Sequence, residues 1–267
     1  MKIAIVTGAS SGLGREFVRQ LEYCYTSLDE IWVIARRRER LEVLQEEVKI
    51  PLRIIEGDLL QHGVFVKLKR LLDMEKPNVR MLVNAAGFGR AGAFADIAGH
   101  EENAQFDMIN LNCTALTRVV QYCLPYLSKG SRIVNLASAA AFCPQPGFVV
   151  YAATKAYVLS FSRGLGVELK QNGIYVTAVC PGPVDTEFFE GIRKMSSSMK
   201  QVAMVKPQQV VRQALLDARA KKPVSVYSLL MKSVAVAAKV VPHELVIKAL
   251  ANESGVGLNH HQESGEL

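Results

Sequence analysis

The sequence predicts a single α/β domain in which helices cover both faces of a parallel sheet. Two observations predict this class. Short apolar runs alternate along the chain with longer segments of helical periodicity. The apolar runs are continuous rather than alternating with polar residues, which is typical of strands buried on both faces. The repeated strand–helix order from residue 2 to residue 180 therefore indicates a doubly wound, Rossmann-type parallel sheet flanked by helices.

Each predicted element has its own local signal. Continuous apolar runs are expected to form strands at residues 2–7, 31–35, 52–56, 81–84, 132–137 and 174–180. Helices are expected between them at 13–23, 37–48, 64–72, 101–127 and 151–171. A glycine-rich turn opens the first helix, and Leu41, Leu44 and Val48 recur at helical spacing in the second. Pro125 fits the end of the fourth helix or a kink in it, and Asn172-Gly173 closes the fifth.

The composition favours one domain with a large core. The chain has 267 residues, of which 49% are hydrophobic and 21% are charged. No linker or repeat is visible, so residues 1–251 are predicted to form one domain and the polar residues 252–267 a flexible tail. No run of about 18 apolar residues is present to span a membrane, and the N-terminus lacks a signal-peptide core. A cytoplasmic location is therefore expected.

The charges and the cysteines narrow the range of partners. The net charge of +7 is dispersed except in the run Arg36 to Arg40, which carries no interleaved aromatic residues. A small anionic ligand is therefore expected, and nucleic acid is not. The five cysteines show no Cys-x-x-Cys spacing and no pairing with histidine. They are expected to be mostly buried thiols in a reducing compartment, without a disulfide framework or a metal site.

A glycine-rich loop follows the first predicted strand, with the sequence Thr7-Gly8-Ala9-Ser10-Ser11-Gly12-Leu13-Gly14. Gly8 would allow a sharp turn, Gly12 would bring backbone N–H groups close to a pyrophosphate, and Gly14 would let the next helix pack close to the sheet. The N-terminus of that helix favours negative charge. A plain turn is the alternative, but it would not need three glycines, so the loop predicts dinucleotide binding.

This loop resembles the N-terminal signature of the short-chain dehydrogenase/reductase family, in its compact single-domain branch. Further motifs resemble that family in the same order along roughly residues 3 to 190. They are Asn84-Ala85-Ala86-Gly87, with Ala85 where the family has a second Asn; Asn112; Ser138; Tyr151 with Lys155; and Pro181-Gly182 followed by Thr186. Asn110 is a rival to Asn112, which is preferred because Ala115 then takes the place of a small residue of the family.

The resemblance implies that Ser138, Tyr151, Lys155 and Asn112 are catalytic. The i, i+4 spacing places Tyr151 and Lys155 on one helix face. A phenol has an unperturbed pKa of about 10, and a nearby ammonium and an oxidised nicotinamide are expected to lower it, so that Tyr151 is the acid in reduction and the base in oxidation. Ser138 is expected to hydrogen-bond the substrate oxygen. The alternative is that it caps or turns the chain at this point. Asn112 is implied to hold a water that links Lys155 to solvent, or it is merely structural.

The resemblance also implies where the cofactor lies. Asp58 is placed at the adenine, residues 84–87 at the ribose, Lys155 at the nicotinamide ribose, and Val184 and Thr186 near the carboxamide. The cofactor-binding residues expected are Gly8, Ser10, Ser11, Gly12, Leu13, Gly14, Arg36, Arg37, Asp58, Leu59, Asn84, Ala85, Ala86, Gly87, Tyr151, Lys155, Pro181, Gly182, Val184 and Thr186.

The end of the second strand predicts NADP(H) rather than NAD(H). An NAD enzyme needs an acidic residue there to accept a hydrogen bond from the 2′-hydroxyl, whereas this chain has Ala35 followed by Arg36 and Arg37. A guanidinium can hold a 2′-phosphate with two charge-assisted hydrogen bonds, and Ser10 is implied to add a third. Arg36 is the first choice because it lies nearer the strand. The alternative places both arginines in the solvated first turn of the next helix, where cations are disfavoured.

Two segments bear on the substrate and on the partners. Phe188 to Met204, together with Phe142, Pro144 and Phe148, predicts a flexible apolar pocket for a hydrophobic carbonyl. Arg193 and Lys194 are the candidates for binding an acidic substrate. Residues 224–251 are apolar but broken by Lys232 and Lys239. This segment is expected to pack against its own subunit or against a partner subunit of a homodimer or homotetramer, and an amphipathic helix on a membrane surface is the alternative.

The expected function is that of an NADP(H)-dependent oxidoreductase that interconverts a carbonyl and a secondary alcohol. A hydrophobic ketone or a 3-oxoacyl compound is the expected substrate. The alternative is a non-catalytic NADP(H)-binding sensor or scaffold, which has no need of the Tyr151 phenol. An epimerase or dehydratase of the family's extended branch would require a longer C-terminal domain and a different glycine spacing.

Overall fold

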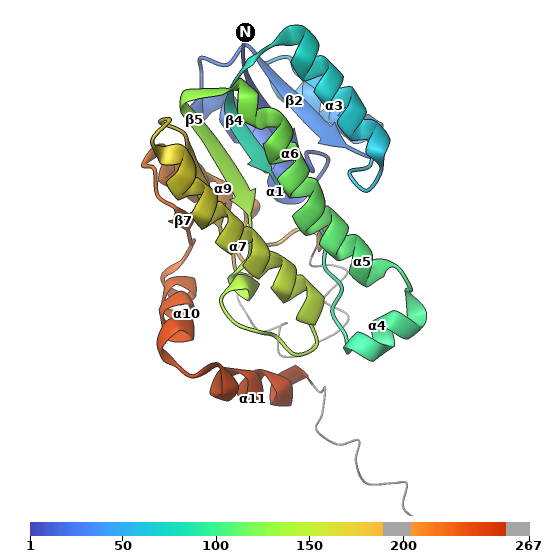
Figure 1. Ribbon diagram of the computed structural model, residues 1–267, viewed down its shortest axis with the longest axis vertical. Coiled ribbons are helices and arrows are strands. Elements are labelled where there is room, and N and C mark those ends of the chain that lie inside the picture. Colours follow the sequence, from blue (N-terminus) through green and yellow to red (C-terminus); the bar gives the residue numbers. More distant parts are fainter. Residues whose placement is uncertain (189–203, 255–267) are drawn as a thin grey trace, which may run out of the picture.

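The chain folds around one parallel sheet, as the sequence predicts. The computed structural model describes residues 1–188 and 204–254, and in this part of the chain seven strands lie in the order β3-β2-β1-β4-β5-β6-β7, every neighbouring pair parallel (Figure 1). The strands are β1 (Lys2–Thr7), β2 (Glu30–Ala35), β3 (Leu52–Glu56), β4 (Asn78–Asn84), β5 (Leu127–Leu136), β6 (Tyr175–Val179) and β7 (Val224–Ser225). The two-residue strand β7 had no signal of its own in the sequence.

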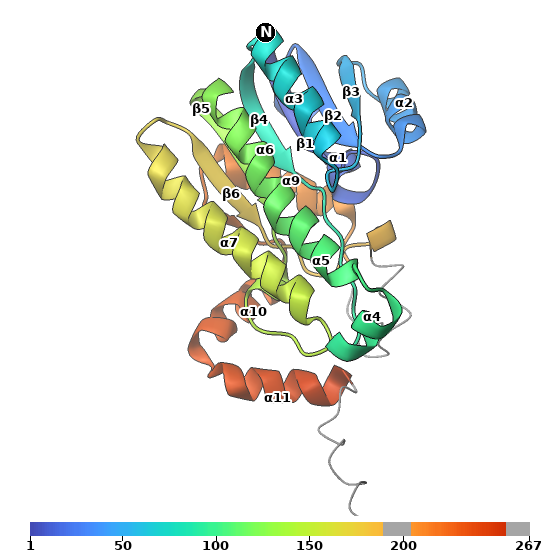
Figure 2. The ribbon, with the colours of Figure 1, turned by 45° about the vertical axis from the view of Figure 1, so that its right-hand side comes forward.

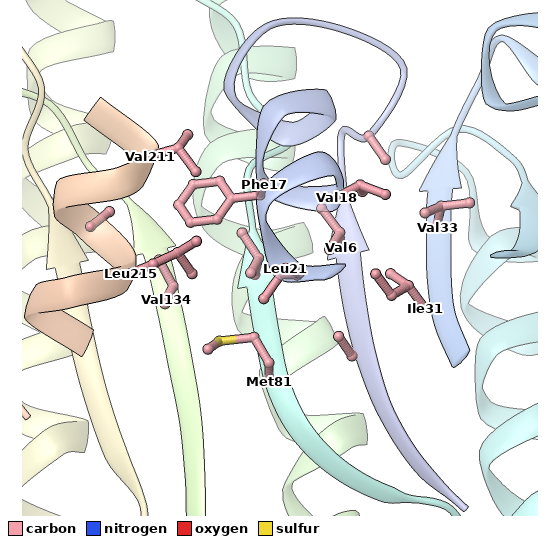
Figure 3. Close-up of a cluster of buried hydrophobic side chains, with 14 of the residues drawn as sticks. Val6, Phe17, Val18, Leu21, Ile31, Val33, Met81, Val134, Val211 and Leu215 are labelled. Atoms are coloured by element: carbon pink, nitrogen blue, oxygen red, sulfur yellow. The ribbon is translucent and has the colours of Figure 1, made fainter. Parts of the chain in front are cut away.

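Helices cover both faces because each strand buries side chains on both. One hydrophobic cluster joins Ala4 and Val6 of β1 to helices α1 (Gly12–Cys24), α2 (Arg38–Glu47) and α9 (Pro207–Arg219). Figure 3 shows this cluster, with Phe17 of α1 and Val211 of α9 directed toward one another between the two helices. The other cluster joins Ile3 and Ile5 to α3 (His62–Glu75), α6 (Leu116–Cys123) and α7 (Val149–Lys170). The continuous apolar runs therefore reflect a sheet buried on both sides.

The long helix predicted at 101–127 is interrupted. After the short helix α4 (Phe94–His100), the chain forms α5 (Ala104–Ile109), a π-helical turn η1 (Asn110–Ala115), then α6 and the 3-10 turn η2 (Leu124–Tyr126), which contains Pro125. Strand β5 then begins at Leu127, earlier than predicted, because the polar residues 128–131 extend it although they carry no apolar pattern.

Two helices lie beyond the carboxyl ends of the strands, namely α10 (Leu229–Val240) and α11 (His243–Ser254) (Figures 1 and 2). Met231 of α10 packs against Gly182, where its sulfur lies 2.8 Å from the place that a Cβ would take. Helix α11 runs to Ser254, so the tail predicted from residue 252 begins inside a helix, and residues 255–267 lie outside the described part. Within the described residues, no helix combines the length and the apolar character needed to cross a membrane.

Candidate active site

A cleft of about 620 Å³ opens at the carboxyl ends of the strands, where a doubly wound sheet is expected to bind its ligand. The glycine-rich loop, the ends of β2 and β4, the start of α7 and the loop after β6 form its walls. All the predicted cofactor-binding residues except Asn84 line this cleft. Among the catalytic candidates, Ser138, Tyr151 and Lys155 line it as well.

The glycine-rich loop is shaped by close backbone approach. Gly8 has φ +68°, and a Cβ there would lie 2.7 Å from the backbone nitrogen of Ala86. Gly14 lies in the first turn of α1, and a Cβ there would lie 2.2 Å from the carbonyl oxygen of Gly8, which directly follows β1. The missing side chain therefore lets the helix approach the end of the strand closely. The buried Thr7 hydroxyl accepts hydrogen bonds from the N–H groups of Ala85 and Ala86, at 3.1 and 3.2 Å. The sequence motif contained Thr7, but no role had been assigned to it.

The N-terminus of α1 fits a pyrophosphate. In the described structure Ser11 makes no side-chain capping hydrogen bond, and the first turn of this helix carries no acidic residue. Its first backbone N–H groups therefore have no competing side-chain partner from these positions, and they carry the partial positive charge of the helix dipole. Together with the glycine cradle, this end of the cleft suits the diphosphate of a dinucleotide.

The basic residues Arg36 and Arg37 lie at one end of the cleft, directly after strand β2. Helix α2 begins at Arg38, so Arg36 and Arg37 precede it rather than form its first turn. Arg37 donates from Nη2 to the Ser10 hydroxyl at 3.3 Å and from Nη1 to Glu187 Oε2 at 3.1 Å. The Arg36 side chain is 72% exposed, and its Nη1 lies 3.9 Å from Asp58 Oδ2. Two guanidinium groups and a hydroxyl thus share one side of the cleft.

Tyr151, Lys155 and Ser138 meet at the other end. Tyr151 lies in the first turn of α7 and is buried, as is Lys155 one turn later. The Lys155 ammonium donates to the carbonyl of Leu136 at 2.8 Å and lies 5.6 Å from the centre of the Tyr151 ring. The Ser138 hydroxyl accepts the Ala140 N–H at 3.1 Å, capping the 3-10 turn η3 (Ala139–Ala141), and it also hydrogen-bonds Tyr151. Ser138 therefore caps the turn η3 and also faces the Tyr151 phenol.

Burial sets the proton affinities in this group. It raises the pKa of Tyr151 to about 12, an effect that the hydrogen bond with Ser138 partly offsets. Burial also lowers the pKa of Lys155 to about 8. Burial of the phenol dominates, and Lys155 is not among the causes that shift the Tyr151 pKa in the protein alone. The predicted lowering with an oxidised nicotinamide bound stays a prediction. The phenol is held in its protonated form.

The side chain of Asn112 is hydrogen-bonded within the protein. The amide of the buried Asn112 donates to the Phe88 carbonyl at 2.9 Å and to the Thr154 hydroxyl at 3.0 Å, while its oxygen accepts the Phe88 N–H at 3.1 Å. Gly87 lies beside both groups, since a Cβ there would lie 2.8 Å from the Asn112 amide oxygen and 3.4 Å from the Lys155 ammonium. The predicted water link remains a prediction.

Asn84 is buried in the sheet instead of facing the cleft. It donates to the Asn135 side chain at 2.9 Å, and Asn135 donates to the Ser162 hydroxyl at 2.9 Å, which ties β4 to β5 and α7. The Asn84 amide nitrogen is thus used within the sheet, while its Oδ1 is buried without a hydrogen-bond partner among the described residues. The predicted ribose contact of Asn84 stays a prediction.

Aromatic rings surround the phenol. Phe148 stacks on Tyr151 with ring centres 4.3 Å apart, and Phe188 lies at 5.5 Å. Phe142 packs instead against the second core cluster, and Pro144 is exposed. Neither of them, nor Phe148, is among the residues that line the cleft. Residues Phe189, Ile192, Arg193, Lys194, Met195 and Met199 of the predicted substrate segment lie outside the described residues. Phe88, Arg90 and Glu187 line the cleft, although the sequence had not pointed to them.

Comparison with known proteins agrees with this architecture. The chain matches the short chain dehydrogenase family over residues 2–197. An uncharacterised oxidoreductase of Staphylococcus epidermidis is 33% identical over 193 residues, which cover 71% of this chain and 81% of the relative. A sulfoacetaldehyde reductase of Chromohalobacter salexigens is 36% identical over 189 residues, covering 68% and 72%. The solved structure of a short-chain dehydrogenase from Sphingobium yanoikuyae in complex with NADPH is 26% identical, covers 100% of this chain and 99% of that one, and superimposes with a TM-score of 0.74.

The family match over more than half the chain, the curated relative and the strand order lead to one conclusion. The chain belongs to the short-chain dehydrogenase family of oxidoreductases, which interconvert alcohols and carbonyls with a nicotinamide cofactor.

Proposed function

We propose that this protein is an NADP(H)-dependent reductase that converts a hydrophobic ketone or 3-oxoacyl compound to a secondary alcohol. One observation carries the proposal. A single cleft holds the phenol, ammonium and hydroxyl of Tyr151, Lys155 and Ser138 at one end and the basic group of Arg36 and Arg37 at the other. A nicotinamide cofactor carries the hydride chemistry itself. The protein then supplies a proton donor in Tyr151, a positive charge beside it in Lys155, a hydrogen-bond donor in Ser138, and a phosphate-binding site in Arg36 and Arg37.

The cofactor, when bound, supplies the hydride. The N-terminus of α1 would hold its pyrophosphate, and Arg36, Arg37 and Ser10 would hold the 2′-phosphate that distinguishes NADP(H) from NAD(H). Ala35 at the end of β2 presents no carboxylate that would repel this phosphate. The binding of NADPH by the Sphingobium relative supports this choice.

The protein supplies the proton. Tyr151 gives its hydroxyl proton to the carbonyl oxygen of the substrate, and the Ser138 hydroxyl donates a hydrogen bond to the same oxygen as negative charge develops there. Lys155 is held in place by the Leu136 carbonyl. Its positive charge stabilises the phenolate that remains, since an opposite charge nearby favours the ionised form of a phenol.

The substrate class follows from what surrounds Tyr151. The rings of Phe148 and Phe188 flank the phenol, and Arg90, which also lines the cleft, is paired with Glu101 at 2.8 Å. Aromatic rings beside a few polar groups suit an apolar substrate that a hydroxyl orients. A hydrophobic carbonyl therefore fits this cleft better than a small anionic aldehyde.

The experiment is NADPH oxidation with ketones and 3-oxoacyl thioesters of increasing chain length, beside sulfoacetaldehyde. We expect kcat/KM to rise with chain length and NADPH to be preferred over NADH. Tight NADPH binding with no oxidation across the panel would instead identify a sensor or scaffold. A preference for NADH would refute the assignment of the cofactor.

A further inference from the structure

An acidic residue lies at the basic end of the cleft. Glu187 follows Thr186 in the loop after β6, far in sequence from the arginines that it meets. Its carboxylate accepts a hydrogen bond from Arg37 Nη1 at 3.1 Å and a second from Arg40, a residue of α2. Arg37 and Glu187 both line the cleft.

The Glu187 carboxylate accepts a hydrogen bond from a guanidinium nitrogen of Arg37 that an incoming phosphate would also need. Arg37 directs Nη1 to Glu187 and Nη2 to Ser10, so both of its terminal nitrogens are engaged. A phosphate recognises a guanidinium through the same forked geometry as a carboxylate. The hydrogen bond from Arg40 and that from Arg37 hold the pKa of Glu187 below its ordinary value, against the effect of burial, so the carboxylate is charged at neutral pH.

We propose that Glu187 is an internal counter-ion of the 2′-phosphate subsite, which the phosphate must displace from Arg37 before it can bind there. Glu187 then determines how strongly the protein discriminates between NADP(H) and NAD(H). Among the described residues, Arg36 forms a longer ion pair, with 3.9 Å between its Nη1 and Asp58 Oδ2. This inference rests on the proposed binding of NADP(H), and it makes Arg37 weaker as a phosphate ligand than its position suggests.

The fold does not depend on this pair. The Arg37 and Glu187 side chains are 37% and 50% exposed, and exposed ion pairs contribute little to stability. The near-isosteric substitution Glu187→Gln should therefore leave the thermal unfolding temperature almost unchanged. It should make the 2′-phosphate bind about three- to tenfold more tightly, as expected for the release of one or two such pairs.

The test is equilibrium titration of the purified protein with NADPH, NADH, adenosine 2′,5′-bisphosphate and adenosine 5′-monophosphate. Glu187→Gln should lower the Kd of the two ligands that carry the 2′-phosphate and leave the other two unchanged. Glu42→Gln is the matched control, because Glu42 pairs with Arg38 of the same basic run at 2.8 Å but does not line the cleft. This control should change no Kd.

A double-mutant cycle identifies the partner. In an Arg37→Ala background, most of the gain from Glu187→Gln should disappear, because the shared guanidinium is gone. Unchanged or weaker NADPH binding by Glu187→Gln, in a wild-type protein that prefers NADPH, would overturn this inference alone. A wild-type protein that binds NADH more tightly would overturn the proposed function, so the two failures are distinguishable.

Discussion

Tyr151 carries the proton in the proposed reaction, and its burial keeps that proton in place until substrate is present. The pKa of about 12 means that the phenol is fully protonated at neutral pH. Tyr151→Phe removes only the hydroxyl, so the fold and NADPH binding should persist. Turnover should fall by about 10²–10⁴-fold or more, the usual contribution of general acid catalysis. Steady-state kinetics and an NADPH titration measure the two effects, and near-full activity would refute the assignment.

The substitution Lys155→Met should differ from Tyr151→Phe in its effect on NADPH binding. It should also abolish turnover, because the ammonium that stabilises the phenolate is lost. Lys155 is also assigned to the nicotinamide ribose, so unlike Tyr151→Phe this change should weaken NADPH binding. Equal NADPH affinity in both variants would restrict Lys155 to its role beside the phenol.

Arg36 and Arg37 should have separable effects on cofactor choice. A hydrogen bond to a charged group contributes about 1.5–3 kcal/mol, so Arg36→Ala should raise the Kd of NADPH by roughly ten- to a hundredfold. NADH affinity should barely change. Arg37→Ala should cost less, because Glu187 already occupies part of that guanidinium. Equal losses for both cofactors would show that the arginines do not contact the 2′-phosphate.

For single residues, the sequence predicted which side chains form the catalytic group better than it predicted which distant residues they contact. Tyr151, Lys155 and Ser138 are found together because a helix spacing and the end of a strand place them, and both are local features. Glu187 meets Arg37 only through the tertiary fold, since the two residues are 150 positions apart in the sequence. The sheet-bound amide of Asn84 was missed for the same reason, since its partner Asn135 lies on the neighbouring strand.

Among the elements, the π-helical turn η1 is the one that no periodicity argument could have located. The apolar spacing of residues 101–127 fits one continuous helix, whereas a π turn adds a residue that shifts the helix face. The shift leaves Asn112 buried and Asn110 exposed. The three hydrogen bonds of Asn112 then join the loop after β4 to α7, close to Lys155.

Asn112→Ala should therefore lower both stability and activity. It leaves the N–H and carbonyl groups of Phe88 without their partner, and an unsatisfied buried polar group costs about 1–3 kcal/mol. We expect a loss of that size in the free energy of unfolding, measured in urea, together with a lower kcat because Phe88 lines the cleft. Asn110→Ala, in the same turn, is the control and should stay within about 0.5 kcal/mol of wild type. Equal effects of the two changes would contradict this assignment.

In the whole molecule, the parallel sheet and its two helical layers followed from rules that a sequence can express. Strands buried on both faces and helical crossovers dictate a parallel, doubly wound sheet. The last two helices were less predictable, because their packing partners are loops at the carboxyl end of the sheet. Met231 contacts Gly182 and Ala238 is buried, so one side of α10 packs on its own subunit.

The other side of α10 remains exposed and leads to the last prediction. Val236 and Val240 are 63% and 78% exposed, and Leu230 and Leu245 add further apolar surface on α10 and α11. Exposed apolar surface of this kind marks a contact with another protein or a membrane. We expect a second copy of the chain to cover it, so that light scattering finds a dimer or tetramer. The double change Val236→Asp and Val240→Asp should then shift the mass toward the monomer.

Val66→Asp is the control for this shift, since Val66 of α3 is also half exposed and lies on a different helix of the molecule. It should leave the subunit count unchanged. The same preparation should stay in solution when it is sedimented with anionic vesicles, because a subunit interface hides the apolar surface that would enter a lipid layer. Sedimentation with the vesicles that weakens at high salt, or a wild-type monomer, would show that a membrane surface covers these helices instead, as attraction to anionic lipid is screened by salt.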